Sequence, residues 1–410
     1  MHTSPLAALG GKETGGMNVY VRELCRALAA RGWHIDAFTR CQDPEAPRIQ
    51  NAWAGRYRVI HIPAGPMEPV DRRMLFPYLP EFAKGVLAFA EAEGLGYDLI
   101  HSHYWLSGWA ARELQRHWRV PVVQMFHTLG RMKERIAGPA DRPEADNRAT
   151  VEQEVMAFVD RIVAATPIDR QQMIELYDVD PNKIVVIPCG VDLELFRPID
   201  PAIARRELGL EEGRRLILFV GRLDPVKGLS VLLEAMCELT RRMHPCRAQD
   251  LSLAVIGGDR ESHLEALTTD MDCLTEIRAE LGLEDLVIFV GSLDQQRLPY
   301  YYSAAEVCVM PSLYESFGMV ALEAMACGTP VIASRVGGLQ YTVRDGETGF
   351  LVPEKNPKAL ADKLELLLND EPLRQRLGQQ AARVAAEFSW EVVADAMEAL
   401  YADLGLAVPA

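Results

Sequence analysis

Long apolar runs are missing from this 410-residue chain. Without a stretch of about 18 apolar residues, the sequence predicts no membrane-spanning helix. Residues 1–10 also lack the basic start and apolar stretch of a signal peptide. The eight cysteines form no C-x-x-C pair, which argues against a disulfide framework or a zinc site. These absences predict a cytoplasmic protein with reduced thiols.

Positive charge is also scarce. The chain has 43 Lys and Arg against 58 Asp and Glu, and its net charge is −15. A nucleic-acid-binding domain is usually basic, so the sequence predicts no nucleic-acid partner. No G-x-x-x-x-G-K-[ST] motif occurs, which argues against a P-loop nucleotide site.

Short β-branched runs alternating with amphipathic helical segments are what the chain does contain. In residues 17–31, for example, apolar side chains recur at helical spacing and Gly32 suits a C-terminal cap. Repeated strand–helix units predict an α/β fold with parallel sheets. The expected strands are residues 33–39, 58–63, 98–103, 120–127, 161–167, 183–190, 215–222, 251–258, 286–292, 307–312, 330–334 and 349–352.

The pattern runs through two series, which predicts two domains. Residues 189–201 contain two prolines and no sustained period, as expected of a linker between them. We therefore expect an N-terminal domain at residues 1–195, a C-terminal domain at 196–375, and helices at 376–410 that pack back on the N-terminal domain. Ligands of such sheets bind beyond the carboxyl ends of the strands, so we expect the site in a cleft between the domains.

Residues 311–334 (PSLYESFGMVALEAMACGTPVIAS) carry the most chemical information. Glu315 and Glu323 lie on either side of an expected helix start at Gly318. The backbone N–H groups of Gly318, Met319 and Val320 would be unpaired donors, which form an anion site. The carboxylates could accept from sugar and ribose hydroxyls. The alternative is that Glu315 caps the helix and Glu323 is a surface residue.

This segment and GRLDPVKG (221–228) resemble the retaining glycosyltransferases of family 4, and the resemblance extends over essentially the whole chain. It implies the GT-B fold, in which two Rossmann-like domains face each other across a cleft. It also implies that Glu315 contacts the donor sugar, that Glu323 contacts the ribose, and that Arg222 and Lys227 clamp the diphosphate. Otherwise the two cations would belong to a solvated turn.

The N-terminal half adds two donor-side candidates. Gly15 and Gly16 precede the first helix, where glycines allow close approach of a phosphate, although a plain turn would look the same. Their spacing is not the G-x-G-x-x-G of dinucleotide-binding proteins. His127 ends an expected strand, and the resemblance places it beside the reacting carbon; the alternative is a structural histidine. His101 and His103 alternate, which predicts opposite faces or a bend, and neither is expected to be catalytic.

No metal or other cofactor is expected, because the nucleotide sugar is a co-substrate. Asp178 and Asp180 match the D-x-D pattern of metal-using glycosyltransferases. They stand in YDVDPNKI, however, between a helix and a strand, where aspartates are typical turn and cap residues.

The acceptor domain is most similar to the inositol-phosphate N-acetylglucosaminyltransferases of mycothiol synthesis. The segments that carry this likeness are residues 2–6, 15–24, 64–66 and 97–108. Sucrose-phosphate synthases come next, although they typically have Gln where Met17 stands. The resemblance implies that the acceptor phosphate is held by Tyr104, Thr128 and Arg148, with Asn18 facing the acceptor hydroxyls. A lysine of the family is replaced here by Arg72 or Arg73, which keeps the charge but changes the geometry.

The hypothesis is therefore a glycosyltransferase that retains the anomeric configuration. It would move a hexose or N-acetylhexosamine from an NDP-sugar to a phosphorylated polyol or sugar such as inositol phosphate, and the resemblance implies that the nucleotide is UDP. The departing diphosphate would help to take the acceptor proton. Alternatives are glucose transfer to fructose 6-phosphate, a sugar-nucleotide epimerase, and a non-catalytic nucleotide-sugar binder. A membrane-bound lipid acceptor lacks support, since no basic amphipathic helix occurs. The sequence leaves open whether the protein forms a homo-oligomer.

The start of the chain departs from the resembled family. There the segment equivalent to residues 2–6 follows an apolar first strand, and here nothing precedes it that could form one. We therefore expect the N-terminal sheet to lack a strand near its middle, residues 1–15 to be disordered or displaced, and activity to be weaker than in an extended form.

Overall fold

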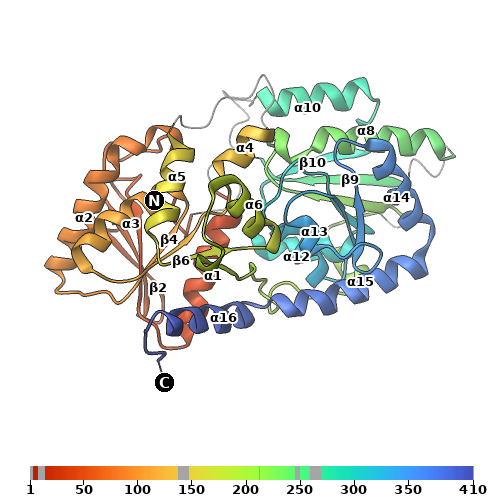
Figure 1. The fold of residues 1–410 in the computed structure, drawn as a ribbon. Coiled ribbons are helices and arrows are strands. Elements are labelled where there is room, and N and C mark those ends of the chain that lie inside the picture. Colours follow the sequence, from red (N-terminus) through yellow and green to blue (C-terminus); the bar gives the residue numbers. More distant parts are fainter. Residues whose placement is uncertain are drawn as a thin grey trace. The chain divides into compact units, whose positions relative to one another are not determined.

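The computed structural model describes residues 3–7, 14–136, 147–211, 213–244, 250–258 and 269–409. These residues divide into two compact units (Figure 1). The first consists of residues 3–7, 14–189 and 390–409, and the second of residues 190–389. Of the described helices, none combines the length and the apolar character needed to cross a bilayer.

The described residues of the first unit form two separate sheets. Three strands have the order β1-β3-β2 and four have the order β4-β5-β6-β7. All pairs are parallel except that of β2 with β3. The strands are β1 (Ile35–Arg40), β2 (Ile49–Trp53), β3 (Tyr57–Ile62), β4 (Ile100–His103), β5 (Val122–Met125), β6 (Arg161–Ala164) and β7 (Ile184–Val186).

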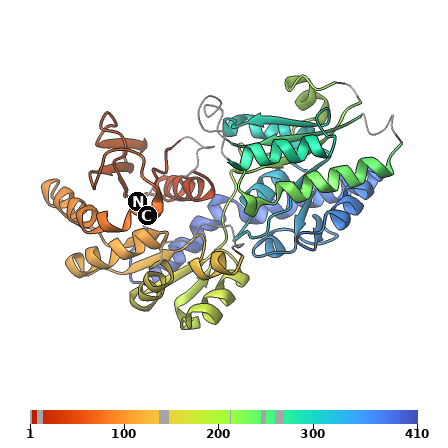
Figure 2. The same ribbon diagram turned by 90° about the horizontal axis from the view of Figure 1, so that it is seen from above.

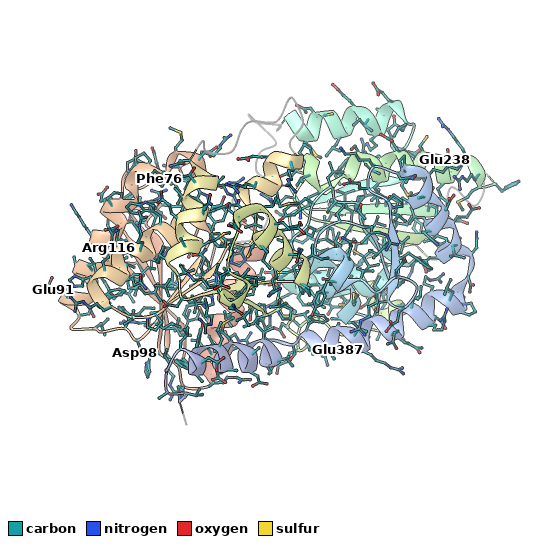
Figure 3. The ribbon with its side chains drawn as sticks, in the orientation of Figure 1. Phe76, Glu91, Asp98, Arg116, Glu238 and Glu387 are labelled. Atoms are coloured by element: carbon teal, nitrogen blue, oxygen red, sulfur yellow. The ribbon has the colours of Figure 1, made fainter. Side chains whose placement is uncertain are left out.

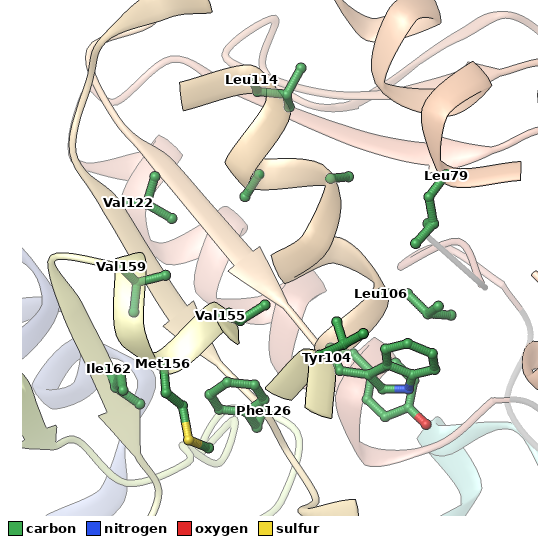
Figure 4. Close-up of a cluster of buried hydrophobic side chains, with 14 of the residues drawn as sticks. Leu79, Tyr104, Leu106, Leu114, Val122, Phe126, Val155, Met156, Val159 and Ile162 are labelled. Carbon is green, nitrogen blue, oxygen red and sulfur yellow. The ribbon is translucent and has the colours of Figure 1, made fainter. Parts of the chain in front are cut away.

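Helices in this unit bury one apolar side against the strands. Leu106 of α3 and Val155 of α5 meet Phe126 and Ile162 in one cluster (Figure 4). Charged side chains such as Glu91 and Arg116 lie on the outside (Figure 3). The helices are α1 (Gly16–Ala30), α2 (Leu79–Ala92), α3 (Trp105–Trp118), α4 (Gly130–Ile136), α5 (Arg148–Phe158), α6 (Pro167–Tyr177) and α16 (Trp390–Asp403), with short 3-10 turns η1 (Arg72–Met74), η2 (Phe76–Tyr78) and η3 (Pro181–Lys183).

The last helix, α16, packs on the first unit although the preceding two hundred residues belong to the second. Arg31 donates to Asp395 at 2.5 Å and to Glu398 at 2.7 Å. The Trp33 indole donates to Glu398 at 2.8 Å. Residues from the two ends of the chain therefore stabilise the same unit.

Residues 3–7 are held in place by α1 and β1. The Asn18 amide donates to Thr3 Oγ1 at 3.0 Å and to the Ser4 carbonyl at 2.7 Å. The Thr39 hydroxyl donates to the Thr3 carbonyl at 3.2 Å. These bonds contradict the expected disorder for residues 3–7, whereas the expected displacement of this segment stays a prediction. Residues 1–2 and 8–13 of that segment lie outside the described residues.

Within its described residues, the second unit is built on one six-stranded parallel sheet with the order β10-β9-β8-β11-β12-β13. Strands β8, β9 and β10 follow one another toward one edge of the sheet, and β11, β12 and β13 follow one another toward the other edge. The strand order therefore reverses between β8 and β11. The strands are β8 (Arg215–Val220), β9 (Leu251–Ile256), β10 (Val287–Gly291), β11 (Val307–Met310), β12 (Val331–Ser334) and β13 (Gly349–Val352).

Two groups of helices flank this sheet (Figure 2). Helix α8 packs against α10 and α14, and α12 packs against α11 and α15. Apolar strand residues such as Val255 and Ile332 are fully buried beneath them, because both faces of the sheet are covered. The helices are α7 (Pro201–Glu207), α8 (Leu229–Arg242), α10 (Thr269–Glu280), α11 (Leu298–Ala304), α12 (Met319–Ala326), α13 (Leu339–Thr342), α14 (Pro357–Asn369) and α15 (Glu371–Ala385), with 3-10 turns η4 (Pro225–Lys227), η6 (Gln295–Arg297) and η7 (Ala386–Phe388).

The predicted α/β architecture is confirmed, and each of the twelve expected strands has an observed counterpart. Strand β2 was not predicted. Its residues, IQNAW, are mostly exposed and form the antiparallel edge of a sheet. A polar edge strand lacks the apolar run by which the buried parallel strands were found.

Candidate active site

Two loops of the second unit meet where the strand order reverses. Residues 221–227 follow β8 and residues 311–318 follow β11, and the two strands are neighbours in the sheet. Both loops therefore lie at the carboxyl ends of adjacent parallel strands, where α/β sheets bind ligands. They contain all of the donor-side residues that the sequence predicted in this half of the chain, apart from those on α12.

The loop after β8 is fixed by a cap and a close backbone approach. Asp224 accepts from the Val226 N–H at 3.0 Å, and the Leu313 N–H donates to the Val226 carbonyl at 2.8 Å. Gly228 has a φ of +68°, and a Cβ there would lie 2.0 Å from the Pro311 carbonyl oxygen. Only glycine fits this contact, so the two loops are held together by backbone.

Lys227 and Glu315, which the sequence placed in different roles, form an ion pair. Lys227 Nζ lies 2.5 Å from Glu315 Oε2, and the two side chains are 21% and 16% exposed. An ammonium has three N–H donors, so Lys227 can bind this carboxylate and a phosphate oxygen together. Arg222 is more exposed, with Nη2 3.7 Å from Asp224 Oδ2. Both cations thus stand on the loop that follows β8.

The start of α12 is supported by a third loop. Gly318 has a φ of +95° and precedes Met319, the first residue of α12. The Gly338 N–H donates to the Glu315 carbonyl at 2.8 Å, and the Thr342 hydroxyl donates to the Phe317 carbonyl at 2.7 Å. A Cβ on Gly338 would lie 2.0 Å from the Ser316 carbonyl oxygen. This support was not predicted, although the pair Gly337-Gly338 after β12 could have indicated it.

Glu323 stands on the second turn of α12, and only 8% of it is exposed. Its Oε2 accepts a hydrogen bond from the hydroxyl of Tyr302 at 2.8 Å. The alternative interpretation of Glu323 as a surface residue is therefore wrong. Tyr302 was not among the predicted residues, because nothing in its local sequence marks it.

In the first unit, Tyr104 and His127 follow the neighbouring strands β4 and β5. Both have positive φ angles, 74° and 61°. Such a conformation costs about 1–3 kcal/mol for a residue with a side chain and persists only where the surrounding structure imposes it. The Tyr104 N–H donates to the Met125 carbonyl at 2.8 Å, and buried Gln124 donates to the Tyr104 carbonyl at 3.3 Å. The fold thus imposes this geometry.

Tyr104, Thr128 and Arg148, predicted to hold the acceptor phosphate, lie together. Arg148 donates to the Tyr104 hydroxyl at 3.2 Å, to the Thr128 carbonyl at 2.8 Å and to the Thr128 hydroxyl at 3.1 Å. Its side chain is fully buried and is paired at 2.8 Å with Glu152, which also accepts from the Gly130 N–H at 2.9 Å. A buried cation held on several sides is fixed in orientation.

Arg72 and Arg73 lie on η1, and Asp71 binds the second of them. Arg73 Nε donates to Asp71 Oδ1 at 2.8 Å, and this guanidinium holds the pKa of the Asp71 carboxyl far below its usual range. Phe76 stacks on Trp105 at 5.8 Å between ring centroids. The stacking places the segment beside the start of α3, next to Tyr104.

The start of α1 contains three of the predicted site residues, Gly15, Gly16 and Asn18. The helix begins at Gly16, one residue before the predicted start, and the Asn18 side chain accepts from the Gly15 N–H at 3.0 Å. Together with its bonds to Thr3 and Ser4, this bond uses both ends of a side-chain amide that is 2% exposed. In this structure Asn18 fastens residues 3–4 and the helix start, a structural role that was not predicted.

His127 belongs to a packed group of histidines. His103 Nδ1 lies 3.1 Å from His127 Nε2, and the rings of His101 and His103 stack at 4.4 Å, so they do not point to opposite faces. His101 Nδ1 lies 2.8 Å from the Tyr401 hydroxyl. Burial lowers the pKa of His101 and of His127 to about 3, and it lowers that of His103 strongly as well. All three rings are therefore neutral at physiological pH.

The two aspartates of the D-x-D pattern are turn residues, as predicted. Asp178 is left-handed, with a φ of 55°, and ends α6. Asp180 accepts from the Asn182 N–H at 2.9 Å and caps η3.

Known proteins resemble this chain along nearly its whole length. Residues 14–195 match the model for Glycosyltransferase Family 4, and residues 201–384 match that for Glycosyl transferases group 1. A D-inositol 3-phosphate glycosyltransferase from Frankia alni is 45% identical over 96% of each chain. One from Acidothermus cellulolyticus is 41% identical over 98% of this chain and 89% of its own.

Solved structures agree with these matches. Sucrose-phosphate synthase from Thermosynechococcus elongatus has a TM-score of 0.89 and 38% identity, covering 98% of this chain and 97% of its own. Anabaena HepE, solved with UDP and glucose, has a TM-score of 0.74 at 18% identity, covering 96% and 97%, and supports the fold. The geometry of the loops and these likenesses identify the chain as a member of the family 4 glycosyltransferases with the GT-B fold.

Proposed function

We propose that this glycosyltransferase moves a hexose or N-acetylhexosamine from a UDP-sugar to inositol phosphate, with retention of the anomeric configuration. The observation that carries the proposal is the 45% identity, over 96% of both chains, to a D-inositol 3-phosphate glycosyltransferase. The grouping of Tyr104, Thr128 and Arg148 supports a phosphorylated acceptor.

The donor would bind to the second unit. Arg222 and Lys227 would hold the diphosphate, together with the N–H groups of Gly318, Met319 and Val320 at the start of α12. Cations aimed at the phosphate oxygens stabilise the negative charge that grows as the bond to the sugar breaks. Glu315 would accept hydrogen bonds from the sugar hydroxyls, because its carboxylate lies beside Lys227, which would bind the diphosphate. Glu323 would accept hydrogen bonds from the ribose hydroxyls.

Retention would follow from attack on the face that the diphosphate leaves. The acceptor hydroxyl forms the new bond to the anomeric carbon as the bond to the diphosphate breaks, and its proton passes to a diphosphate oxygen. Catalysis then rests on positioning and charge stabilisation, with no covalent enzyme intermediate. His127, neutral at physiological pH because of burial, could exchange hydrogen bonds with sugar hydroxyls but would contribute no charge.

The acceptor would bind to the first unit. A phosphate monoester carries almost two negative charges, which suits guanidinium groups in fork geometry. Arg148 is oriented by Glu152, and Arg72 and Arg73 add charge from η1. Gly15 and Gly16 would lie beside a donor phosphate, since glycine lets the backbone approach a phosphate closely, although the Gly15 N–H itself donates to Asn18. No metal is required, because the side-chain cations supply the positive charge.

A second candidate is transfer of glucose to fructose 6-phosphate. It is supported by the TM-score of 0.89 and 38% identity to a sucrose-phosphate synthase. Both reactions use a nucleotide sugar and a phosphorylated acceptor, so the donor residues do not separate them.

The test is a matrix of donors against acceptors, with products read by mass. UDP-glucose and UDP-N-acetylglucosamine are each combined with inositol 3-phosphate, free inositol and fructose 6-phosphate. We expect product with inositol 3-phosphate and none with free inositol, and no effect of a metal chelator. Product with fructose 6-phosphate alone would establish the second candidate. Consumption of the UDP-sugar without an acceptor would indicate an epimerase.

A further inference from the structure

A buried phenol–carboxylate pair lies behind the start of α12. Tyr302 of α11 is completely buried, and its hydroxyl donates to Glu323 Oε2 at 2.8 Å. The Tyr302 carbonyl accepts from the Thr329 hydroxyl at 2.6 Å, and its ring packs edge-on against Phe196 at 6.0 Å. The hydroxyl is therefore fixed by the fold before any ligand binds.

Its surroundings keep Tyr302 a hydrogen-bond donor. Burial raises the pKa of its hydroxyl well above the usual value, and the nearby Glu323 carboxylate raises it further. Burial and Glu323 also raise the pKa of the Cys308 and Cys327 thiols. Glu323 is thus surrounded by groups that keep their protons, and the bond from Tyr302 to a charged acceptor is of the strong kind.

Such a bond restricts a flexible side chain. A glutamate has three side-chain torsions, and its carboxylate has about four lone-pair sites, so it can accept from Tyr302 and from other donors at once. Such an acceptor suits neighbouring hydroxyl groups such as those at the 2′ and 3′ positions of a ribose. A fixed carboxylate recognises such a pair better than a mobile one, because less freedom is lost on binding.

We propose that Tyr302 is a positioning residue that holds Glu323 in the orientation that recognises the ribose hydroxyls, so that it contributes to selection of ribonucleoside over deoxyribonucleoside diphosphates. This rests on the proposed function, in which Glu323 contacts the ribose. Tyr302 lies 21 residues from Glu323 in sequence and would not touch the substrate itself.

The experiment measures the affinity of UDP and of 2′-deoxy-UDP by calorimetry for four proteins: wild type, Tyr302→Phe, Glu323→Gln and Tyr301→Phe. Tyr301→Phe is the matched control, because it removes one hydroxyl from the same helix. A hydrogen bond to a charged group is worth about 1.5–3 kcal/mol, so we expect wild type to prefer UDP by about 10-fold or more. In Tyr302→Phe the preference should fall several-fold, with 2′-deoxy-UDP affinity nearly unchanged. Tyr301→Phe should match wild type.

A merely structural role of Tyr302 would weaken both ligands equally. The inference would be overturned if Tyr302→Phe lost affinity equally for UDP and 2′-deoxy-UDP, or if it kept the full preference for UDP. Glu323→Gln would still report separately on the role of Glu323 in the donor site. The double variant of Tyr302→Phe and Glu323→Gln should lose no more preference than Glu323→Gln alone. A wild-type protein that binds no UDP would instead overturn the proposed function itself. Urea midpoints of the variants identify any loss caused by unfolding.

Discussion

Removal of the Lys227 ammonium should lower the stability of the protein a little and the rate of sugar transfer much more. At 2.5 Å and an effective dielectric constant of about 20, the attraction between Lys227 and Glu315 is about 6–7 kcal/mol before desolvation. Both side chains are about four-fifths buried, so most of this attraction is offset by desolvation and lost side-chain freedom. We expect Lys227→Ala to destabilise the protein by about 1–3 kcal/mol, because it leaves a carboxylate without its cation.

The loss in transfer should be larger and should have a different cause. Removing one preorganised charge from a developing anion costs about 100–1,000-fold in turnover. Adding Glu315→Gln to Lys227→Ala removes the unpaired charge, so stability should recover while transfer stays low. The assays are urea unfolding, and product formation read by mass at saturating donor and acceptor.

The control for charge removal is Lys358→Ala, an exposed lysine on α14. It should leave both the urea midpoint and turnover within experimental error. Turnover within twofold of wild type in Lys227→Ala would refute the diphosphate role. A double variant less stable than Lys227→Ala would refute the argument from the ion pair.

Three further predictions follow from particular contacts. Gly338→Ala should lower stability by about 1–3 kcal/mol and weaken UDP binding, because its Cβ would lie 2.0 Å from the Ser316 carbonyl oxygen; unchanged UDP affinity by calorimetry would contradict this. Tyr104→Phe should raise the KM for the phosphorylated acceptor about 10-fold with the donor KM unchanged, since it removes a partner of Arg148; equal rises in both constants would argue against an acceptor role. Acid should destabilise the first unit. The pKa of His101 is about 3 in the folded protein, so this ring stays neutral there, whereas in the unfolded chain it takes up a proton below about pH 6.5. The contribution of His101 to stability is therefore complete above about pH 6.5 and falls as the pH is lowered toward 3. In urea unfolding at pH 7.5, 6 and 5, His101→Asn should make this dependence shallower, while His103 and His127 keep part of it; a slope as steep as that of wild type would contradict the assignment.

Local sequence determined the features that depend on neighbours along the chain. Apolar runs identified the buried parallel strands, because both faces of each strand are covered. Glu315 and Glu323 could be placed on either side of a helix start, because a loop and one turn of helix separate them. Gly16 and Gly318 could be placed at helix starts for the same reason.

Contacts between distant segments were decided by the tertiary structure alone. Lys227 and Glu315 are 88 residues apart, and Tyr302 and Glu323 are 21 apart; neither pairing has a local pattern. The close approach of Gly338 to Ser316 likewise depends on which strands become neighbours. The polar edge strand β2 forms because β3 offers it hydrogen bonds. The sequence therefore determined which groups the glycosyltransferase has, and packing of the sheets determined which of them meet, because strand order is a long-range property.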